Sequence, residues 1–384
     1  MFSIDRDYIT QVLTELVRID SRNPSLTESA PGEVKIAEYI AAKLREIGLE
    51  IQVQEIDKKH PNVIGILKGS GGGKSLMLNG HMDSVGVEGM DDPFGAKIVN
   101  GRLYGRGSQD MKGSLASMIG AAKALAEADI NIKGDLIIAA VGDEEYASLG
   151  TEHVLKEYSA DAAIVTEPTD MKLCRAHRGF IWYRVQTTGR AAHGSRYDVG
   201  IDANMHMGRF LAELERLERE TRERAPHSLT GPPSLHASLL KGGTEVSVYA
   251  AKSELHIERR TLPGEIEADI TAELQEIIDE LAAEDASFRA TVEAYLERPA
   301  LETGEGTEIV GITETAMTKH LGSIQEHIGV PFWTDAALTA EAGIETILLG
   351  PKGDGLHSAE EWVGLDSVYD LAEVLAETAT SYCS

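Results

Sequence analysis

The first part of the chain alternates between helical and strand-like hydrophobic patterns. In GEVKIAEYIAAKLREIG, Ile36, Ile40 and Leu44 fall on one helix face, and Gly48 follows as a stop signal. MKGSLASMIGAAKALAEA predicts a helix of small residues that packs closely on a sheet. Short apolar runs predict strands at residues 51–56, 63–67, 76–78 and 136–141. Alternating helices and strands of this kind are typical of an α/β domain with a parallel sheet.

The pattern changes at Phe180 and changes back near residue 300. Between these points the sequence predicts strand, helix, two strands, helix and strand, at residues 180–189, 201–223, 234–243, 245–260, 264–284 and 288–297. This βαββαβ order is that of a small ferredoxin-like α+β domain. A helix at 305–320, a strand at 346–350 and a helix at 365–381 then resume the α/β pattern. We therefore expect an α/β catalytic domain, residues 1–179 and 296–384, interrupted by an inserted domain, residues 180–295.

The helix expected at residues 201–223 is rich in charge. Its mixed charges predict a solvent-exposed helix, on which Phe210, Leu214 and Leu217 offer an apolar stripe for an interface. His206 is expected on its surface.

Length, composition and charge limit the class of protein to which this chain can belong. With 384 residues the chain exceeds the usual size of one core, which agrees with two domains. No apolar run approaches the roughly 20 residues of a membrane span, and charges interrupt the first 20 residues, so a signal peptide is not expected. Only Cys174 and Cys383 occur, without a CxxC pattern, which favours the reducing cytoplasm. The net charge of −27 argues against nucleic acid and anionic membranes as partners.

Polar residues that can bind metal stand at the ends of the predicted strands or in the loops after them. They are His81 and Asp83, Asp110, the run Asp143-Glu144-Glu145, Glu167, and His357. Because sites in open α/β sheets collect at the carboxyl ends of strands, these side chains point to one place. Like charges crowded there would repel one another unless a cation neutralised them.

Histidines mixed with carboxylates suit Zn²⁺ or Co²⁺ better than Mg²⁺ or Ca²⁺, which prefer oxygen ligands. One ion needs three or four protein ligands, whereas five donors with one bridging carboxylate suit two ions about 3.5–4 Å apart. Each residue alone also has a simpler interpretation. Asp110 precedes a helix and could be its N-cap, and Asp143 is expected to be only a turn residue.

Taken together, the motifs resemble those of the co-catalytic zinc aminoacylase/peptidase family, which includes acetylornithine deacetylase, succinyl-diaminopimelate desuccinylase, aminoacylase and glutamate carboxypeptidase. The matching stretches, which span nearly the whole chain, are NGHMDSV, GRGSQDMKG, DEEYASLGT, TEPT, RAAHGS, RRTLPGE and WTDAALTAEAGIETILLGPKGDGLHS. The resemblance implies a zinc-peptidase-like catalytic domain whose insert serves as a lid and dimerisation domain.

The resemblance also implies a role for each metal-site residue. His81, Asp110 and Glu167 would bind one metal, and Asp110 would bridge to a second, held also by Glu145 and His357. Asp83 would orient the His81 ring. Glu144 would be the general base, a role that metal-activated water requires because its proton must pass to the leaving amine.

In the insert, the resemblance implies that His193 reaches the neighbouring subunit's site and helps to stabilise the oxyanion. Arg260 matches the arginine that holds a substrate carboxylate, although Arg259 beside it leaves the choice open. Asp202 and Ser247 depart from the family, which often has Asn at both positions. We expect a homodimer built through residues 180–295, with hinges near 178–180 and 294–298 that close on substrate.

Three functions compete at this stage. The favoured one is a di-zinc hydrolase, with Co²⁺ as a substitute metal, that cleaves the amide bond of an N-acyl amino acid. Glu167 favours this deacylase over a dipeptidase or glutamate-carboxypeptidase-like metallopeptidase, since peptidase members of the family often carry Asp there. A non-catalytic metal- or ligand-binding protein on the same fold is the third, and Glu144, a base that binds no metal, argues against it.

Overall fold

A computed structural model describes residues 2–128, 130–323 and 326–384. Within them the chain forms two compact units. The first comprises Met1–Arg175, Thr303–Ile328 and Thr334–Ser384, and the second comprises Ala176–Glu302 and Gly329–Trp333. The second unit contains residues 180–295, the segment that the sequence assigns to the insert.

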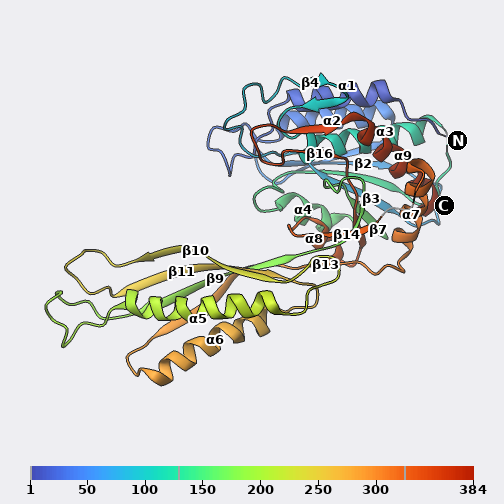
Figure 1. The fold of residues 1–384 in the computed structure, drawn as a ribbon. Helices are drawn as coiled ribbons and strands as arrows, with labels where there is room; N and C mark the ends of the chain where they lie inside the picture. Colours follow the sequence, from blue (N-terminus) through green and yellow to red (C-terminus); the bar gives the residue numbers. More distant parts are fainter. Residues whose placement is uncertain (1, 129, 324–325) are drawn as a thin grey trace. The chain divides into compact units, whose positions relative to one another are not determined.

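The first unit is built on a mixed sheet (Figure 1). The order of its strands is β1-β2-β6-β3-β7-β15-β8-β13. The strands are β1 (Glu50–Glu55), β2 (Pro61–Leu67), β3 (Leu76–His81), β6 (Leu136–Val141), β7 (Ala162–Val165), β8 (Leu173–His177), β14 (His327–Val330) and β15 (Glu345–Leu348). β6, β3, β7 and β15 run parallel to their neighbours in this series, whereas β1, β2 and β8 are antiparallel additions. The carboxyl ends of the four parallel strands therefore lie at one edge of the sheet.

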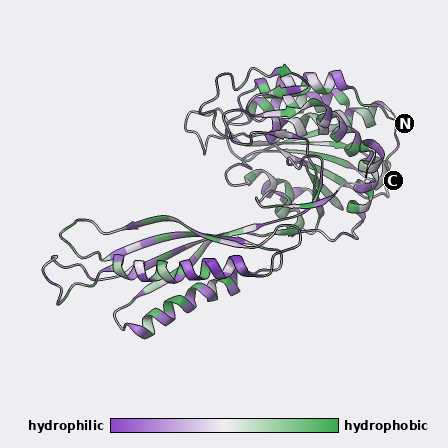
Figure 2. Ribbon diagram, viewed as in Figure 1, coloured by the Kyte–Doolittle hydropathy of each residue, from purple (hydrophilic) through white to green (hydrophobic). Residues whose placement is uncertain are grey.

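Alternate residues of these strands fill two separate cores. Leu76, Leu78 and Ile138 pack into a large core cluster, while Met77 and Ile137 pack into a smaller one. Since successive side chains of a strand point to opposite faces, the clusters lie on opposite faces of the sheet. The helices are α1 (Arg6–Arg18), α2 (Val34–Ile47), α3 (Gly113–Glu127), α7 (Glu308–Leu321) and α9 (Leu365–Tyr382) in the large cluster, with α4 (Leu149–Glu157) in the smaller one and α8 (Ala336–Glu341) near α4. Figure 2 shows that the main sheet is largely hydrophobic, as a sheet covered on both faces should be.

The first unit also contains a small antiparallel sheet, which is separate from the main sheet. Its strands are β4 (Lys97–Val99), β5 (Arg102–Tyr104), β16 (Gly353–Asp354) and β17 (Trp362–Gly364). These runs of two or three residues were not expected from the sequence, because they are too short to show an alternating pattern. By pairing β5 with β17, the sheet joins the segment that leads to Asp110 with the segment that follows His357.

The second unit has the predicted βαββαβ order. Its elements are β9 (Gly179–Thr188), α5 (Ala203–Glu223), β10 (Ser234–Gly242), β11 (Lys252–Thr261), α6 (Glu267–Glu284) and β12 (Ala290–Arg298), followed by β13 (Leu301–Glu302). The sheet order is β10-β11-β9-β12, and both helices lie on one face of it (Figure 1). The expected fold class, an α/β unit with a ferredoxin-like α+β insert, is confirmed.

Two expectations about α5 are wrong. Phe210, Leu214 and Leu217 are buried in the core of the second unit, and the His206 ring is buried beside Phe288. The physical reason is that a four-stranded sheet with helices on one face needs their apolar stripes to cover that face. The stripe is therefore used inside the unit and does not offer an interface.

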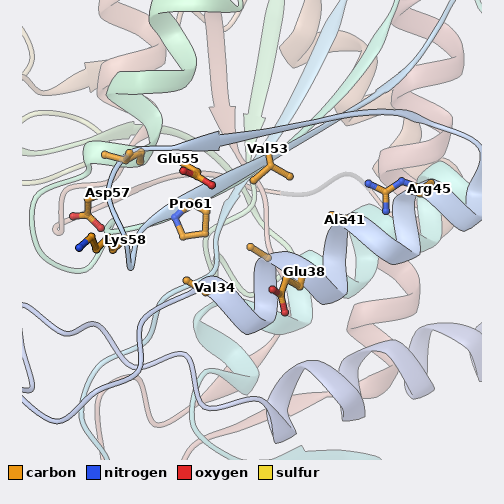
Figure 3. Close-up of a pocket in the computed structure, with 11 residues that line it drawn as sticks. Val34, Glu38, Ala41, Arg45, Val53, Glu55, Asp57, Lys58 and Pro61 are labelled. Carbon is orange, nitrogen blue, oxygen red and sulfur yellow. The ribbon is translucent and has the colours of Figure 1, made fainter.

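A groove of about 750 Å³ opens in the first unit between α2 and the β1–β2 hairpin (Figure 3). Val34, Ala41 and Val53 line its apolar part, and Arg45 and Lys58 stand among its charged residues. No residue of the expected metal site lines it. In the part of the chain that the structure describes, no helix is long and apolar enough to cross a membrane.

Candidate active site

Three of the loops that carry candidate ligands meet because of the strand order. His81 is the last residue of β3 and pairs with Val141, the last residue of β6. The acidic run, Asp143 to Glu145, follows β6 at once, and Glu167 lies two residues beyond β7. Since β6 and β7 flank β3 with the same direction, both groups of carboxylates arrive beside His81.

Asp110 lies between the two histidines. Its Oδ1 is 2.9 Å from His81 Nε2, and its Oδ2 is 3.3 Å from His357 Nε2. His357 Nε2 is also 3.1 Å from Glu145 Oε2, and His81 Nε2 is 3.8 Å from Glu167 Oε1. The five expected ligands thus form one cluster, with Asp110 in the middle, where a bridging carboxylate would be needed.

Asp110 is not the N-cap of a helix, so that interpretation is wrong. It lies inside a π-helical turn, Ser108–Lys112, with non-helical backbone angles, and α3 begins only at Gly113 with Lys112 as its N-cap. The turn leaves the carboxylate of Asp110 directed at His81 and His357 and not at the first backbone amides of α3.

Electrostatics of the cluster follow from burial and crowding. Burial, followed by the charge of Asp110, raises the pKa of Glu145 to about 7 and that of Glu167 to about 8. Burial also raises the pKa of Glu144, with Glu167 as the next cause. Hydrogen bonds with Asp110 and Glu145 raise the pKa of His357 to about 10. Burial and crowding therefore disfavour the ionised carboxylates unless a positive counter-charge is present.

The donor set fits a transition-metal cation as that counter-charge. The structure contains two groups of possible ligand atoms, one made by His81, Glu144 and Glu167 and the other by His81, Asp110 and Glu145, and within each group the atoms lie within 4.8 Å of one another. Buried Glu145 Oε1 has no hydrogen-bond partner among the described residues, so one oxygen is left for a further ligand. Imidazole nitrogens together with carboxylate oxygens are the donors that Zn²⁺ and Co²⁺ accept. Glu144, expected as a base, is therefore close enough to be counted with the ligands.

Comparison with known proteins identifies the family of this chain. A model of the peptidase family M20/M25/M40 matches residues 77–381, most of the chain. This chain belongs to that family. The resemblance inferred from the motifs is confirmed, and the chain is a metallohydrolase of the peptidase and amidohydrolase class.

Relatives of this M20-family chain include enzymes that remove acyl groups. It is 29% identical to N-formyl-4-amino-5-aminomethyl-2-methylpyrimidine deformylase of Bacillus subtilis, over 91% of this chain and 89% of the relative. It is 27% identical to acetylornithine deacetylase of Myxococcus xanthus, over 97% of this chain and 96% of the relative. A crystal structure of a dinuclear metal-binding M20 peptidase from Bacillus subtilis matches with a TM-score of 0.75, at 17% identity and 98% coverage of each chain.

A layer of buried polar side chains, made by Asn23, Asn62 and Asp83, holds the acidic run of this M20 enzyme in place. Asn62 Oδ1 accepts from Gly142 N at 3.1 Å, and Asn23 Nδ2 donates to Asp143 Oδ1 at 2.9 Å. The Asp83 carboxylate accepts from the backbone amides of Glu144 and Glu145, both at 3.1 Å. Gly142 and each of the three residues of the run are therefore fixed by a side chain from another segment.

This layer changes the interpretation of Asp83 and Asp143. Asp83 contacts His81 Nδ1 through its backbone oxygen at 3.1 Å, with its carboxylate farther away at 3.6 Å, so the carboxylate serves the acidic run more directly than the ring. Asp143 does occupy a turn, with a left-handed φ of 65°, but it is also fully buried and hydrogen-bonded to Asn23. It is more than a turn residue.

The second unit carries the remaining candidates. His193 is exposed, and its Nδ1 lies 2.9 Å from Ser195 Oγ. Arg260 is partly exposed, lies over the Phe180 ring at 5.1 Å, and pairs with Glu258. Arg259, by contrast, is buried and paired with Glu265 at 2.6 Å, so its guanidinium is engaged in holding the fold.

The two departures from the family pattern also have local structural roles. Asp202 is the N-cap of α5, where its side chain accepts from Asn204 N at 2.9 Å. Ser247 accepts from Gly194 N through its backbone oxygen at 2.7 Å, beside the segment that carries His193. An Asn could serve at either position, so neither departure disturbs the fold around it.

Sequence reasoning did not identify Asn23, Asn62, Arg106 or Glu361. Each is buried and hydrogen-bonded to a segment that carries a candidate ligand. Arg106 lies inside the motif GRGSQDMKG, which could have directed attention to it. The others stand alone in sequence and gave no signal.

Proposed function

We propose that this chain is a metal-dependent deacylase that uses water to cleave the amide bond of an N-acyl amino acid. The observation that carries the proposal is Glu144, a half-buried carboxylate with an oxygen within 4.8 Å of a ring nitrogen of His81 and of a carboxylate oxygen of Glu167. Burial favours the protonated form of Glu144, and a neighbouring cation would favour the ionised form. A group balanced in this way suits the acceptance and release of one proton.

Two Zn²⁺ ions, with Co²⁺ as a substitute, are the proposed cofactors. His81, Asp110 and Glu167 would hold one of them, and Asp110, Glu145 and His357 would hold the other. When bound, such ions supply Lewis-acid activation of water and of the amide carbonyl. The contacts of Asp110 with both histidines support its role as the bridge.

The residues of the chain would then move the proton and hold the substrate. Glu144 takes a proton from the attacking water as the water oxygen bonds to the amide carbon. The same proton passes to the leaving nitrogen as the C–N bond breaks, which releases a carboxylic acid and a free amine. Arg260 would hold the substrate carboxylate, a role supported by its exposure and by the engagement of Arg259 elsewhere.

The substrate class rests on the relatives. A deformylase and an acetylornithine deacetylase both cleave a small acyl group from an amine, and each matches nearly the full length of this chain. A dipeptidase or glutamate-carboxypeptidase-like metallopeptidase is the alternative, favoured by the peptidase family and by the likeness to a dinuclear metal-binding peptidase.

The test is a substrate panel with the zinc-loaded, cobalt-loaded and chelated protein. N-formyl, N-acetyl and N-succinyl amino acids are followed by amine release, and dipeptides by chromatography of the products. We expect amine release from acylated amino acids, restored by either metal after chelation. Cleavage of dipeptides alone would replace the deacylase with the peptidase alternative, and a protein that binds no transition metal would refute both.

Two variants separate the base from a ligand. Glu144→Ala should keep both metal equivalents but lower kcat by about 10²–10⁴-fold, the usual size of a general-base contribution. Glu145→Ala should instead lose one equivalent in a metal titration, because it removes a ligand. If the two variants titrate alike, the proposed division of roles is wrong.

We also propose a homodimer formed through residues 180–295, in which His193 helps to stabilise the oxyanion in the neighbouring subunit's site, with hinges near 178–180 and 294–298. Support comes from large apolar side chains exposed on this segment, including Tyr197, Met205 and Leu239. Exposed apolar side chains of this size are typical of interaction surfaces.

A further inference from the structure

Arg106 and Glu361 form an ion pair buried in the first unit, outside the proposed ligand set. Arg106 Nη1 lies 2.7 Å from Glu361 Oε2, and the two residues are 2% and 1% exposed. A buried ion pair is weak evidence for stability, because desolvation of both charges offsets most of their attraction. The hydrogen bonds that surround the pair indicate another role.

The Glu361 carboxylate fixes the turn that contains Asp110. Its Oε2 accepts from Gly107 N at 2.9 Å, and its Oε1 accepts from Gln109 N at 2.9 Å and from Asp110 N at 3.1 Å. Three backbone amides of one turn, including that of the proposed bridging residue, thus depend on one carboxylate.

The remaining donors of Arg106 reach two other loops. Its Nε donates to the backbone oxygen of Gly86 at 2.7 Å, in the loop that follows His81. Its Nη2 donates to the backbone oxygen of Ser358 at 2.9 Å, one residue after His357. The pair therefore connects the loops of three proposed ligands, which lie far apart in the sequence.

We propose that Arg106 and Glu361 are positioning residues that set the placement of Asp110 relative to His357, and through it the affinity of the site for metal. This inference rests on the proposed function, because it takes Asp110 and His357 as ligands. A planar guanidinium with donors in fixed directions suits the task of holding loops in register, which a lysine could not do. Groups that orient metal ligands typically change metal affinity 10–100-fold when they are replaced.

The experiment compares Glu361→Gln with a matched control, Glu265→Gln. Glu361→Gln replaces one of the two acceptor oxygens with an NH₂ group. That donor would face the N–H groups of the turn or of Arg106, which are donors themselves. Glu265 accepts likewise from a buried arginine, Arg259, and from a backbone amide, but in the second unit, where no proposed metal ligand lies. Both substitutions should lower the thermal unfolding temperature, so stability alone does not distinguish them.

The affinity for metal distinguishes the two variants. Zn²⁺ is titrated against a chromophoric chelator, and the absorption spectrum of bound Co²⁺ reports the geometry of the site without any turnover. We expect Glu361→Gln to weaken Zn²⁺ binding 10–100-fold and to alter the Co²⁺ spectrum, with Glu265→Gln within about twofold of wild type.

Wild-type affinity in Glu361→Gln, or an equal loss in both variants, would overturn the positioning role while leaving the proposed function intact. A wild-type protein that binds neither metal would overturn the proposed function and this inference with it. If Glu361→Gln does not fold, Arg106→Lys takes its place, because it keeps the charge but loses the fork that reaches Gly86 and Ser358. The same change in affinity is expected and the same result overturns it.

Discussion

Replacement of Asn23 should destabilise the protein more than replacement of an exposed residue, because the Asn23 side chain lies between two buried carboxylates. Asn23 is fully buried, and its Nδ2 donates to Asp83 Oδ2 at 2.8 Å and to Asp143 Oδ1 at 2.9 Å. Its Oδ1 accepts from Ser25 N at 2.8 Å. Both carboxylates lose a donor in Asn23→Ala, and no water-exposed position is available to them, since Asp83 and Asp143 are buried as well.

The magnitude follows from the number and kind of these bonds. A hydrogen bond to a charged group contributes about 1.5–3 kcal/mol, and two of them would give roughly 3–6 kcal/mol. Single substitutions rarely exceed about 4–5 kcal/mol, and neighbouring groups relax, so we expect Asn23→Ala to lower the free energy of unfolding by about 3 kcal/mol. Asn23→Asp should do at least as much at pH 7, because it adds a third carboxylate to the pair.

Urea denaturation of the metal-loaded protein measures the effect, with the exposed Asn204→Ala as control, expected within about 0.5 kcal/mol of wild type. The carboxyl group that Asn23→Asp introduces would have a raised folded-state pKa, so this variant should regain part of its loss as the pH falls and the new group takes up a proton. A loss of less than about 1 kcal/mol in Asn23→Ala, or an Asn23→Asp deficit that does not change with pH, would refute the reasoning.

Two further predictions concern pH and assembly. The hydrogen bond to buried Glu33 raises the pKa of His60 to about 9, so protonated His60 stabilises the fold fully below about pH 6.5, and this contribution is lost as the pH rises through about 9. His60→Gln should therefore remove a fall in unfolding free energy on the order of 3 kcal/mol between these pH values, and equal slopes in both proteins would contradict this. Mixing the inactive variants Glu144→Ala and His193→Ala under subunit exchange should restore part of the activity, because one site in each mixed dimer combines both intact residues. Proven exchange without recovery would show that His193 does not act across the dimer.

The sequence predicted which side chains gather at the candidate site better than it predicted the residues that support them. His81, Asp110 and Glu167 could be found because strand ends in an α/β sheet converge, and because their motifs are specific. Asn23 and Glu361 could not, since a single polar residue in a loop gives no indication of burial or of the segment that it meets. Their partners are distant in sequence: Glu361 accepts from Asp110, 251 positions away.

The same limit explains the error on α5. The charges of residues 201–223 indicated an exposed helix correctly on one face, but the pattern could not show what the other face covers. Only the sheet formed by β9 and β11 makes Phe210 a core residue. The short strands β4 and β16 were missed for a related reason, because a run of two or three residues takes its structure from its partner and not from its own pattern.

The position of β15 between β7 and β8 has a consequence for synthesis on the ribosome. The main sheet cannot be completed until residue 348 has left the ribosome, about 175 residues after β8 begins. The α+β insert lies wholly within that interval, so it can fold while its host still exposes an unpaired strand edge to solvent or to chaperones. The insert can therefore be complete before the main sheet is, because β15 is synthesised after it.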